Sequence, residues 1–80
     1  MDTQKALNWI SDVLGTNGRS VTLEDSRHSI PEWDSLGALL LLSRLEEDLN
    51  IVISADEIAA ISSVKEMCDL LEKNKAFSAT

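Results

Sequence analysis

The sequence predicts an all-α fold, a small antiparallel helical bundle of three main helices plus one short helix, with a long first loop. Three observations predict it. Apolar residues recur at helical spacing in separate segments of the chain. Capping residues flank those segments. The chain has 80 residues, 44% of them hydrophobic, which suffices for one core and leaves no room for a second. We therefore expect a single domain over residues 1–80.

The first helix is expected over residues 3–14, where one apolar stripe recurs at helical spacing. Thr3 is a suitable N-cap, and Gly15 follows at the place where a left-handed C-cap is expected. The next segment, residues 16–33, has apolar residues without a sustained period and contains the turn signal Asn17-Gly18. We predict a long loop here, held to the helices by its apolar side chains.

The second helix is expected over residues 35–49, with Asp34 or Ser35 as its cap. The helical spacing divides its side chains into two faces. The predicted core face holds Ala38, Leu41, Leu42, Leu45 and Leu49, whereas the predicted outer face holds Leu36, Gly37, Leu40, Ser43, Arg44, Glu47 and Asp48.

Two capping-box patterns mark the last two helices. Ser54 and Glu57 stand three residues apart and predict a short helix over residues 55–60. Ser63 and Glu66 repeat the pattern and predict a helix over residues 64–75. The β-branched run 51–53 is expected to be a linker, and residues 76–80 a frayed tail.

Charge and composition exclude several classes of protein. The formal net charge of −7, from 14 acidic and 7 basic side chains, disfavours nucleic acid as a partner. No apolar stretch is long enough for a membrane span, and the N-terminus does not resemble a signal peptide. The single Cys68 forbids an internal disulfide and favours a cytoplasmic location. One cysteine and one histidine, His28, cannot form a structural zinc site, so no metal is expected.

The segment Trp33-Asp34-Ser35-Leu36 carries the chemically informative residue. A serine hydroxyl stands where a long loop meets a leucine-rich helix. The backbone N–H groups of a helix start are unpaired and the helix dipole is positive there, so both favour a phosphate on Ser35. The plain alternative is that Ser35 only caps the helix.

Asp34-Ser35-Leu36 opening the second helix of an acidic domain of this length resembles the acyl carrier protein family. The resemblance covers about residues 3–75. It implies that Ser35 carries a covalent 4′-phosphopantetheine, taken from coenzyme A, whose thiol holds acyl or aminoacyl groups as thioesters. Asp34 and Leu36 would be part of the attachment motif. The chain itself would be no enzyme, and Cys68 would be a buried hydrophobic residue.

The same resemblance implies several partners: a phosphopantetheinyl transferase, an acyl- or aminoacyl-loading enzyme, and synthase or transferase enzymes of fatty-acid, polyketide-type or specialised biosynthesis. The residues expected to contact them are Leu40, Arg44, Glu47, Asp48, Asp56 and Glu57. Gly37 and Leu40 stand where general fatty-acid carriers usually have acids, and Trp33 replaces a small residue. These differences favour a specialised carrier, which we expect to be monomeric.

Three alternatives accompany this interpretation. The chain could be an unmodified helical interaction module that binds partners through Leu36, Leu40 and its acidic surface. The loop could instead fold over these two leucines. A small hydrolase using Ser35 and His28 would show turnover by the purified, unmodified chain, and we expect none.

Overall fold

The computed structural model describes residues 1–16 and 19–78, and this part of the chain contains four helices and no strand. The expected turn at Asn17-Gly18 lies outside the described residues. The all-α class, with three main helices and one short helix, is confirmed. The helices are α1 (Thr3–Leu14), α2 (Ser35–Leu49), α3 (Ala55–Ala60) and α4 (Val64–Lys73).

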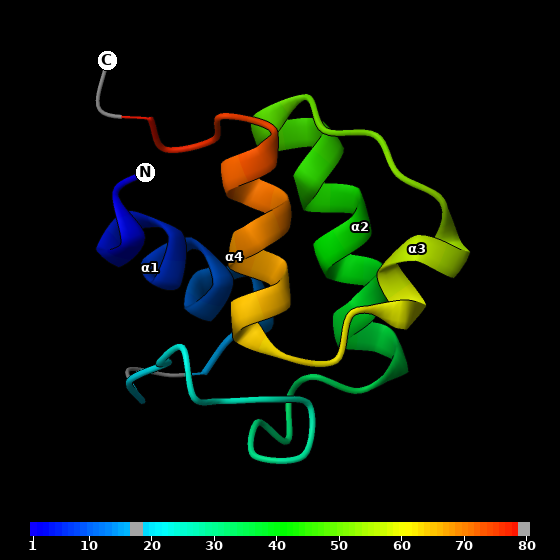
Figure 1. Ribbon diagram of the computed structural model, residues 1–80. Helices are drawn as coiled ribbons and strands as arrows, with labels where there is room; N and C mark the ends of the chain where they lie inside the picture. The colour runs from blue at the N-terminus through cyan, green and yellow to red at the C-terminus, as the bar shows by residue number, and fades with distance from the viewer. Residues whose placement is uncertain (17–18, 79–80) are drawn as a thin grey trace.

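Helix α1 packs against both α2 and α4, and α3 packs against α2 (Figure 1). Helices α2 and α4 begin at the same end of the bundle, and α1 ends there. The long first loop crosses this end, so it runs beside the start of α2. Helices α2 and α4 run in the same direction, because α3 and its connections return the chain to the end at which α4 begins, and α1 crosses both at a large angle.

The core is aliphatic, as the composition requires, and its largest fully buried side chains include Ile10, Leu41, Leu45, Met67 and Leu71. The buried face of α2 is rotated from the predicted one. Its fully buried positions follow the spacing 37, 41 and 45, whereas positions 38, 42 and 49 are only half-buried. Gly37, expected on the outer face, therefore belongs to the interior.

The helix ends largely follow the capping signals. Asp2, not Thr3, caps α1 by accepting a hydrogen bond from the N–H of Lys5. Gly15 has a φ of 70° and closes α1 in the left-handed conformation, as predicted. Asn50, at φ 60°, closes α2 in the same way. Asparagine tolerates this conformation better than most residues that carry a Cβ.

Serines cap the N-termini of the last two helices, α3 and α4. Ser54 and Glu57 form the full predicted capping box. Ser63 accepts a hydrogen bond from the N–H of Glu66 as predicted. The second half of that box differs, because the Glu66 carboxylate accepts from the hydroxyls of Ser62 and Ser63. These two bonds hold the pKa of Glu66 below its usual range, the Ser63 bond more strongly.

The segment after α4 departs from the expected frayed tail. Helix α4 ends at Lys73, two residues before the predicted end. Ala76 is buried, and the ring of Phe77 lies 6.3 Å from that of Trp9 between centroids. The Phe77 carbonyl also accepts a hydrogen bond from the N–H of Asp2 at 2.8 Å. The expectation is therefore wrong for Ala76, which is buried, and for Phe77, which packs on Trp9 of α1. Residues 79–80 lie outside the described part.

Candidate functional site

Ser35 is the first residue of α2, and the cap of this helix is Asp34. The Asp34 Oδ1 accepts a hydrogen bond from the N–H of Gly37 at 2.9 Å. The Asp34 carbonyl accepts from the N–H of Ala38 at 2.9 Å. Ser35 is exposed, and among the described residues its hydroxyl makes no hydrogen bond. The alternative that Ser35 is the cap of α2 is therefore wrong.

Several other serines use their hydroxyls structurally, whereas Ser20, like Ser35, is exposed and its hydroxyl makes no hydrogen bond among the described residues. The hydroxyls of Ser54 and Ser63 cap α3 and α4. The hydroxyl of Ser26, which shares the Asp-Ser pair of the motif, accepts a hydrogen bond from the N–H of His28. Ser35 thus combines exposure with a hydroxyl that has no structural task, which is what an enzyme needs from a serine that it modifies.

Two buried residues fix the start of α2. The side chain of Trp33, just before the cap, is only 2% exposed. A Cβ at Gly37 would lie 2.3 Å from the carbonyl oxygen of Glu32 and 3.1 Å from Cδ2 of Leu14. The absence of a side chain at Gly37 lets α2 approach the loop and the end of α1 this closely. Ser35 therefore lies between two closely packed residues, Trp33 and Gly37.

Three leucines beside Ser35 face the solvent, and we call Leu36, Leu39 and Leu40 the leucine patch. Their exposed fractions are 65%, 56% and 43%. Leu36 and Leu40 therefore face outward, as predicted. The alternative, that the loop folds over these two leucines, is wrong. Leu39 was missed, although its position three residues after Leu36 places it on the same side of a helix.

A cavity of about 250 Å³ lies directly beside the serine, and we call it the serine cavity. Its apolar wall comes from α2 and α3 and includes Ala38, Leu39, Ile58 and Ala59. Ser35 and Arg27 also line it, and among the described residues Arg27 is the one charged side chain in this lining. The place of Arg27 could not be predicted from the sequence, because nothing in the loop's aperiodic sequence indicates that this residue reaches the start of α2.

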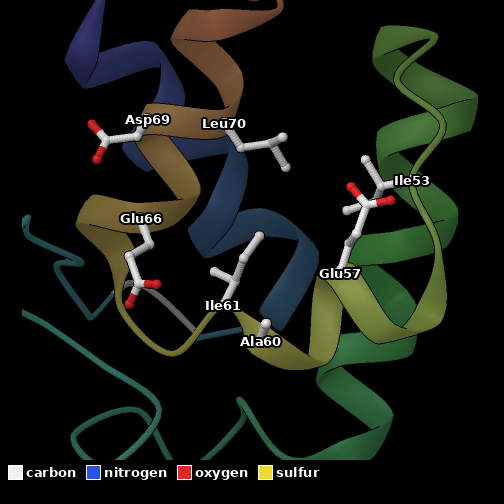
Figure 2. Close-up of a pocket in the computed structure, with 7 residues that line it drawn as sticks. All are labelled: Ile53, Glu57, Ala60, Ile61, Glu66, Asp69 and Leu70. Carbon is white, nitrogen blue, oxygen red and sulfur yellow. The ribbon is translucent and has the colours of Figure 1, made fainter.

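A second hollow, of about 400 Å³, lies between α3 and α4 (Figure 2). Ile53, Ile61 and Leu70 supply its apolar lining, and carboxylates at positions 57, 66 and 69 stand around it. Ser35 is not among its lining residues. Of these two hollows, only the serine cavity has Ser35 among its described lining residues.

The predicted partner-binding charges divide into two groups. Glu47, Asp56 and Glu57 are exposed, although Glu57 also serves the capping box of α3. Arg44 and Asp48 instead tie α2 to α1. The Arg44 Nε donates to Asp48 Oδ2 at 2.8 Å, and the Trp9 Nε1 donates to the same oxygen at 3.0 Å. A longer contact of 3.4 Å joins Arg44 to Asp12.

The Asp48 contacts predict a pH dependence of stability. Hydrogen bonds from Trp9 and then Arg44 lower the pKa of Asp48 below its usual range. A carboxylate whose pKa is lower in the folded than in the unfolded chain stabilises the fold above the unfolded pKa, near 4. This contribution is lost as the pH falls through the folded pKa. Urea unfolding from about pH 5 to pH 3 should therefore show a smaller loss of stability for Asp48→Asn than for wild type.

The matched control for this prediction is Glu46→Gln, which removes one negative charge from the same part of α2. Unfolding should be followed by circular dichroism, since the Trp9 fluorescence would itself respond to the substitution. If the free energy of unfolding fell equally with pH in wild type and Asp48→Asn, the assigned role of the Trp9 and Arg44 hydrogen bonds would be contradicted.

The structure gives no support to catalysis by His28 or Cys68. His28 is exposed, and no hydrogen bond joins it to Ser35 within the described residues. A serine nucleophile needs such a contact with its base. Cys68 is buried, as predicted, and burial raises the pKa of its thiol. A thiol with a raised pKa is a poor nucleophile.

The sequence matches the family described as "Phosphopantetheine attachment site" over residues 4–71. The chain belongs to this family. Its domains are carriers, generally without catalytic activity, that hold a covalently attached 4′-phosphopantetheine and work with synthetase and transferase partners. The resemblance to acyl carrier proteins is thereby confirmed. The structure fits this group, because an exposed serine without a structural task opens α2 beside a cavity.

This carrier domain is also similar to a segment of N-(5-amino-5-carboxypentanoyl)-L-cysteinyl-D-valine synthase from Penicillium rubens and from Penicillium chrysogenum. In both cases the identity is 32% over 75 residues, which cover 92% of this chain. They cover 2% of each synthase, so the chain spans a very small part of these relatives. Within the described residues, no helix has the length and apolar character that crossing a membrane requires.

Proposed function

We propose that Ser35 is the attachment residue of this carrier domain and that its arm presents acyl or aminoacyl thioesters to partner enzymes. The observation that carries the proposal is the division of tasks at the start of α2. Asp34 provides the cap, whereas Ser35 remains exposed with its hydroxyl unused among the described residues.

The chain's part in its own modification is that of a substrate. The Ser35 Oγ would attack a phosphorus of the pyrophosphate of coenzyme A, forming an O–P bond while the anhydride bond breaks and adenosine 3′,5′-bisphosphate leaves. Groups of the transferase would accept the hydroxyl proton and hold the magnesium ion, because no side chain in the described part of this chain makes a hydrogen bond with the Ser35 hydroxyl. The bound arm supplies a terminal thiol, the group that forms the thioester.

An aminoacyl or peptidyl cargo is favoured over a fatty-acyl one. The relatives' name describes a synthase of a cysteinyl-valine compound, which contains amino acids. On this likeness we propose that the present chain carries aminoacyl or peptidyl groups in a specialised pathway. The unusual positions of this chain, Trp33 and Leu40, agree with a specialised carrier. We also propose that the chain is cytoplasmic and monomeric, as its composition and single cysteine predict.

Partner enzymes are proposed to bind the leucine patch beside the arm. Exposed apolar side chains that adjoin one another mark protein contacts more often than isolated ones do. The exposed carboxylates of Glu47, Asp56 and Glu57 would add attraction for basic partner surfaces. Arg44 and Asp48 contribute less, since each already makes contacts within the chain. The same patch could serve an unmodified interaction module, the alternative function.

Alanine substitutions at Ser35 and Ser54 distinguish a serine that carries the arm from a serine that caps a helix. We expect Ser35→Ala to abolish labelling by a fluorescent coenzyme A analogue and a broad-specificity transferase. Its free energy of unfolding should stay within about 0.5 kcal/mol of wild type, because no cap is lost. Ser54→Ala should lose about 1 kcal/mol with the α3 cap and keep full labelling. In-gel fluorescence and urea unfolding measure the two effects.

Ser26→Ala is a second control, because Asp25-Ser26 repeats the first two residues of the motif. Labelling that persists in Ser35→Ala would overturn the assignment of the attachment residue. A folded wild-type chain that no transferase labels would favour the interaction module.

A further inference from the structure

Arg27 has no ion-pair partner among the described residues, and it lies beside Ser35, where the arm would begin. Ion pairs engage both other arginines: Arg19 contacts Glu32, and Arg44 contacts Asp48 and Asp12. Among the described residues, no carboxylate lies within ion-pair distance of Arg27. Its side chain nevertheless turns toward the bundle and lines the serine cavity together with Ser35.

The loop that carries Arg27 is fixed to the connection between α3 and α4. The N–H of Arg27 donates to the Ser62 carbonyl at 3.0 Å, and the Asp25 carbonyl accepts from the N–H of Val64 at 3.0 Å. Ser26 and Ser63 form an isolated antiparallel bridge between the same two segments. The backbone of Arg27 is therefore held in place before any ligand arrives, which lowers the entropy cost of using its side chain.

Most N–H donors of the Arg27 guanidinium make no hydrogen bond within the described part of the chain. The Arg27 Nη1 lies 3.4 Å from the carbonyl oxygen of Ala59, near the end of α3, which is a long hydrogen bond. This contact directs the side chain along the cavity and leaves most of its five N–H groups free. A guanidinium with free donors is suited to a phosphate, which it can bind through two parallel hydrogen bonds.

We propose that Arg27 binds the phosphodiester of a phosphopantetheine arm on Ser35 and that the apolar wall of the serine cavity receives the adjoining dimethyl segment. The inference rests on the proposed function of Ser35. A phosphodiester there is a fixed negative charge, and Asp34 is another beside it; Arg27 supplies the compensating positive charge. At about 250 Å³ the cavity is below the size of pockets for whole drug-sized ligands, so it suits only the first part of the arm.

Arg27 is thus a positioning residue, which orients the arm as it leaves the protein. The thiol end extends beyond the cavity and stays available to partner enzymes. The leucine patch shares Leu39 with the cavity wall, so the anchored arm and the proposed partner surface adjoin each other.

Nuclear magnetic resonance of the arginine Nε–Hε groups, before and after attachment of the arm, tests the proposal. We expect the Arg27 signal to shift on attachment, whereas Arg19 and Arg44, already paired, keep theirs. The ³¹P signal of the arm should differ between wild type and Arg27→Gln. That difference should shrink in 1 M salt, where screening acts over about 3 Å.

Two further variants complete the test. Arg27→Lys keeps the charge without the planar fork and should restore part of the ³¹P shift, and Lys5→Gln removes an exposed cation on α1 and should leave it unchanged. Intact mass first confirms the arm in every sample. If wild type accepts no arm, the proposed function fails and this inference with it. If the arm is present but the Arg27 signal does not move, or all three arginines shift alike, only this inference is overturned.

Discussion

Replacing Gly37 by alanine is expected to lower the free energy of unfolding by about 2 kcal/mol. The new Cβ would lie 2.3 Å from the carbonyl oxygen of Glu32, closer than nonbonded atoms can approach. The atom that it meets belongs to the backbone, so no side-chain rotation relieves the contact. Alanine in a helix is favoured over glycine by about 1 kcal/mol, and the steric cost must exceed this gain. Urea unfolding followed by circular dichroism measures the net effect.

The same substitution should also slow the modification of Ser35, since α2 must move away from the loop to relieve the contact. The matched control is Ser43→Ala on the exposed side of α2, which tests alanine in the same helix without the close approach. We expect its stability to lie within about 0.5 kcal/mol of wild type. A Gly37→Ala protein as stable as wild type would show that the start of α2 is not held in the way described.

Replacing Trp33 by alanine is expected to cost about 3–5 kcal/mol, the usual loss for a large buried aromatic residue. A domain of this size has a total stability of about 4–12 kcal/mol, so the variant should lose a large fraction of it, and at the lower end of this range it would not fold at 25 °C. The indole is 2% exposed and directly precedes Asp34 and Ser35. Its loss removes the packing that positions Ser35, the proposed attachment residue, and thermal unfolding measures the effect.

Trp33→Phe keeps this prediction testable if the alanine variant does not fold. Within the described part of the chain, the buried Nε1 of Trp33 has no hydrogen-bond partner. Phenylalanine removes this unsatisfied donor and keeps most of the apolar ring, so we expect a change below about 1.5 kcal/mol. Trp33→Phe should also retain modification of Ser35. Equal losses of stability in both variants would contradict packing as the role of Trp33.

The helices of this carrier domain could be predicted because their signals are local. Capping residues and apolar spacing act within one or two turns, so the starts at Thr3, Ser35 and Val64 agree with the structure. The predicted buried face of α2 is rotated from the observed one, because so many of the first residues of this helix are leucines. Spacing alone cannot tell which leucines face the core, and the close approach at Gly37 decides it.

The surroundings of Ser35 could be predicted only in part. The motif indicates the serine, and spacing indicates Leu36 and Leu40. The position of Arg27 beside Ser35 depends on contacts of the loop with the end of α3 and the α3–α4 connection, which lie more than thirty residues away in sequence. The packing of Phe77 on Trp9 is another long-range contact that no local pattern predicts.

The most direct measurement is the intact mass of the chain after incubation with coenzyme A, magnesium and a broad-specificity phosphopantetheinyl transferase, followed by peptide mapping. Our account predicts the gain of one phosphopantetheine, located on Ser35 and absent from Ser35→Ala. An adduct on another serine, or no adduct on a chain shown by circular dichroism to be folded, would contradict it.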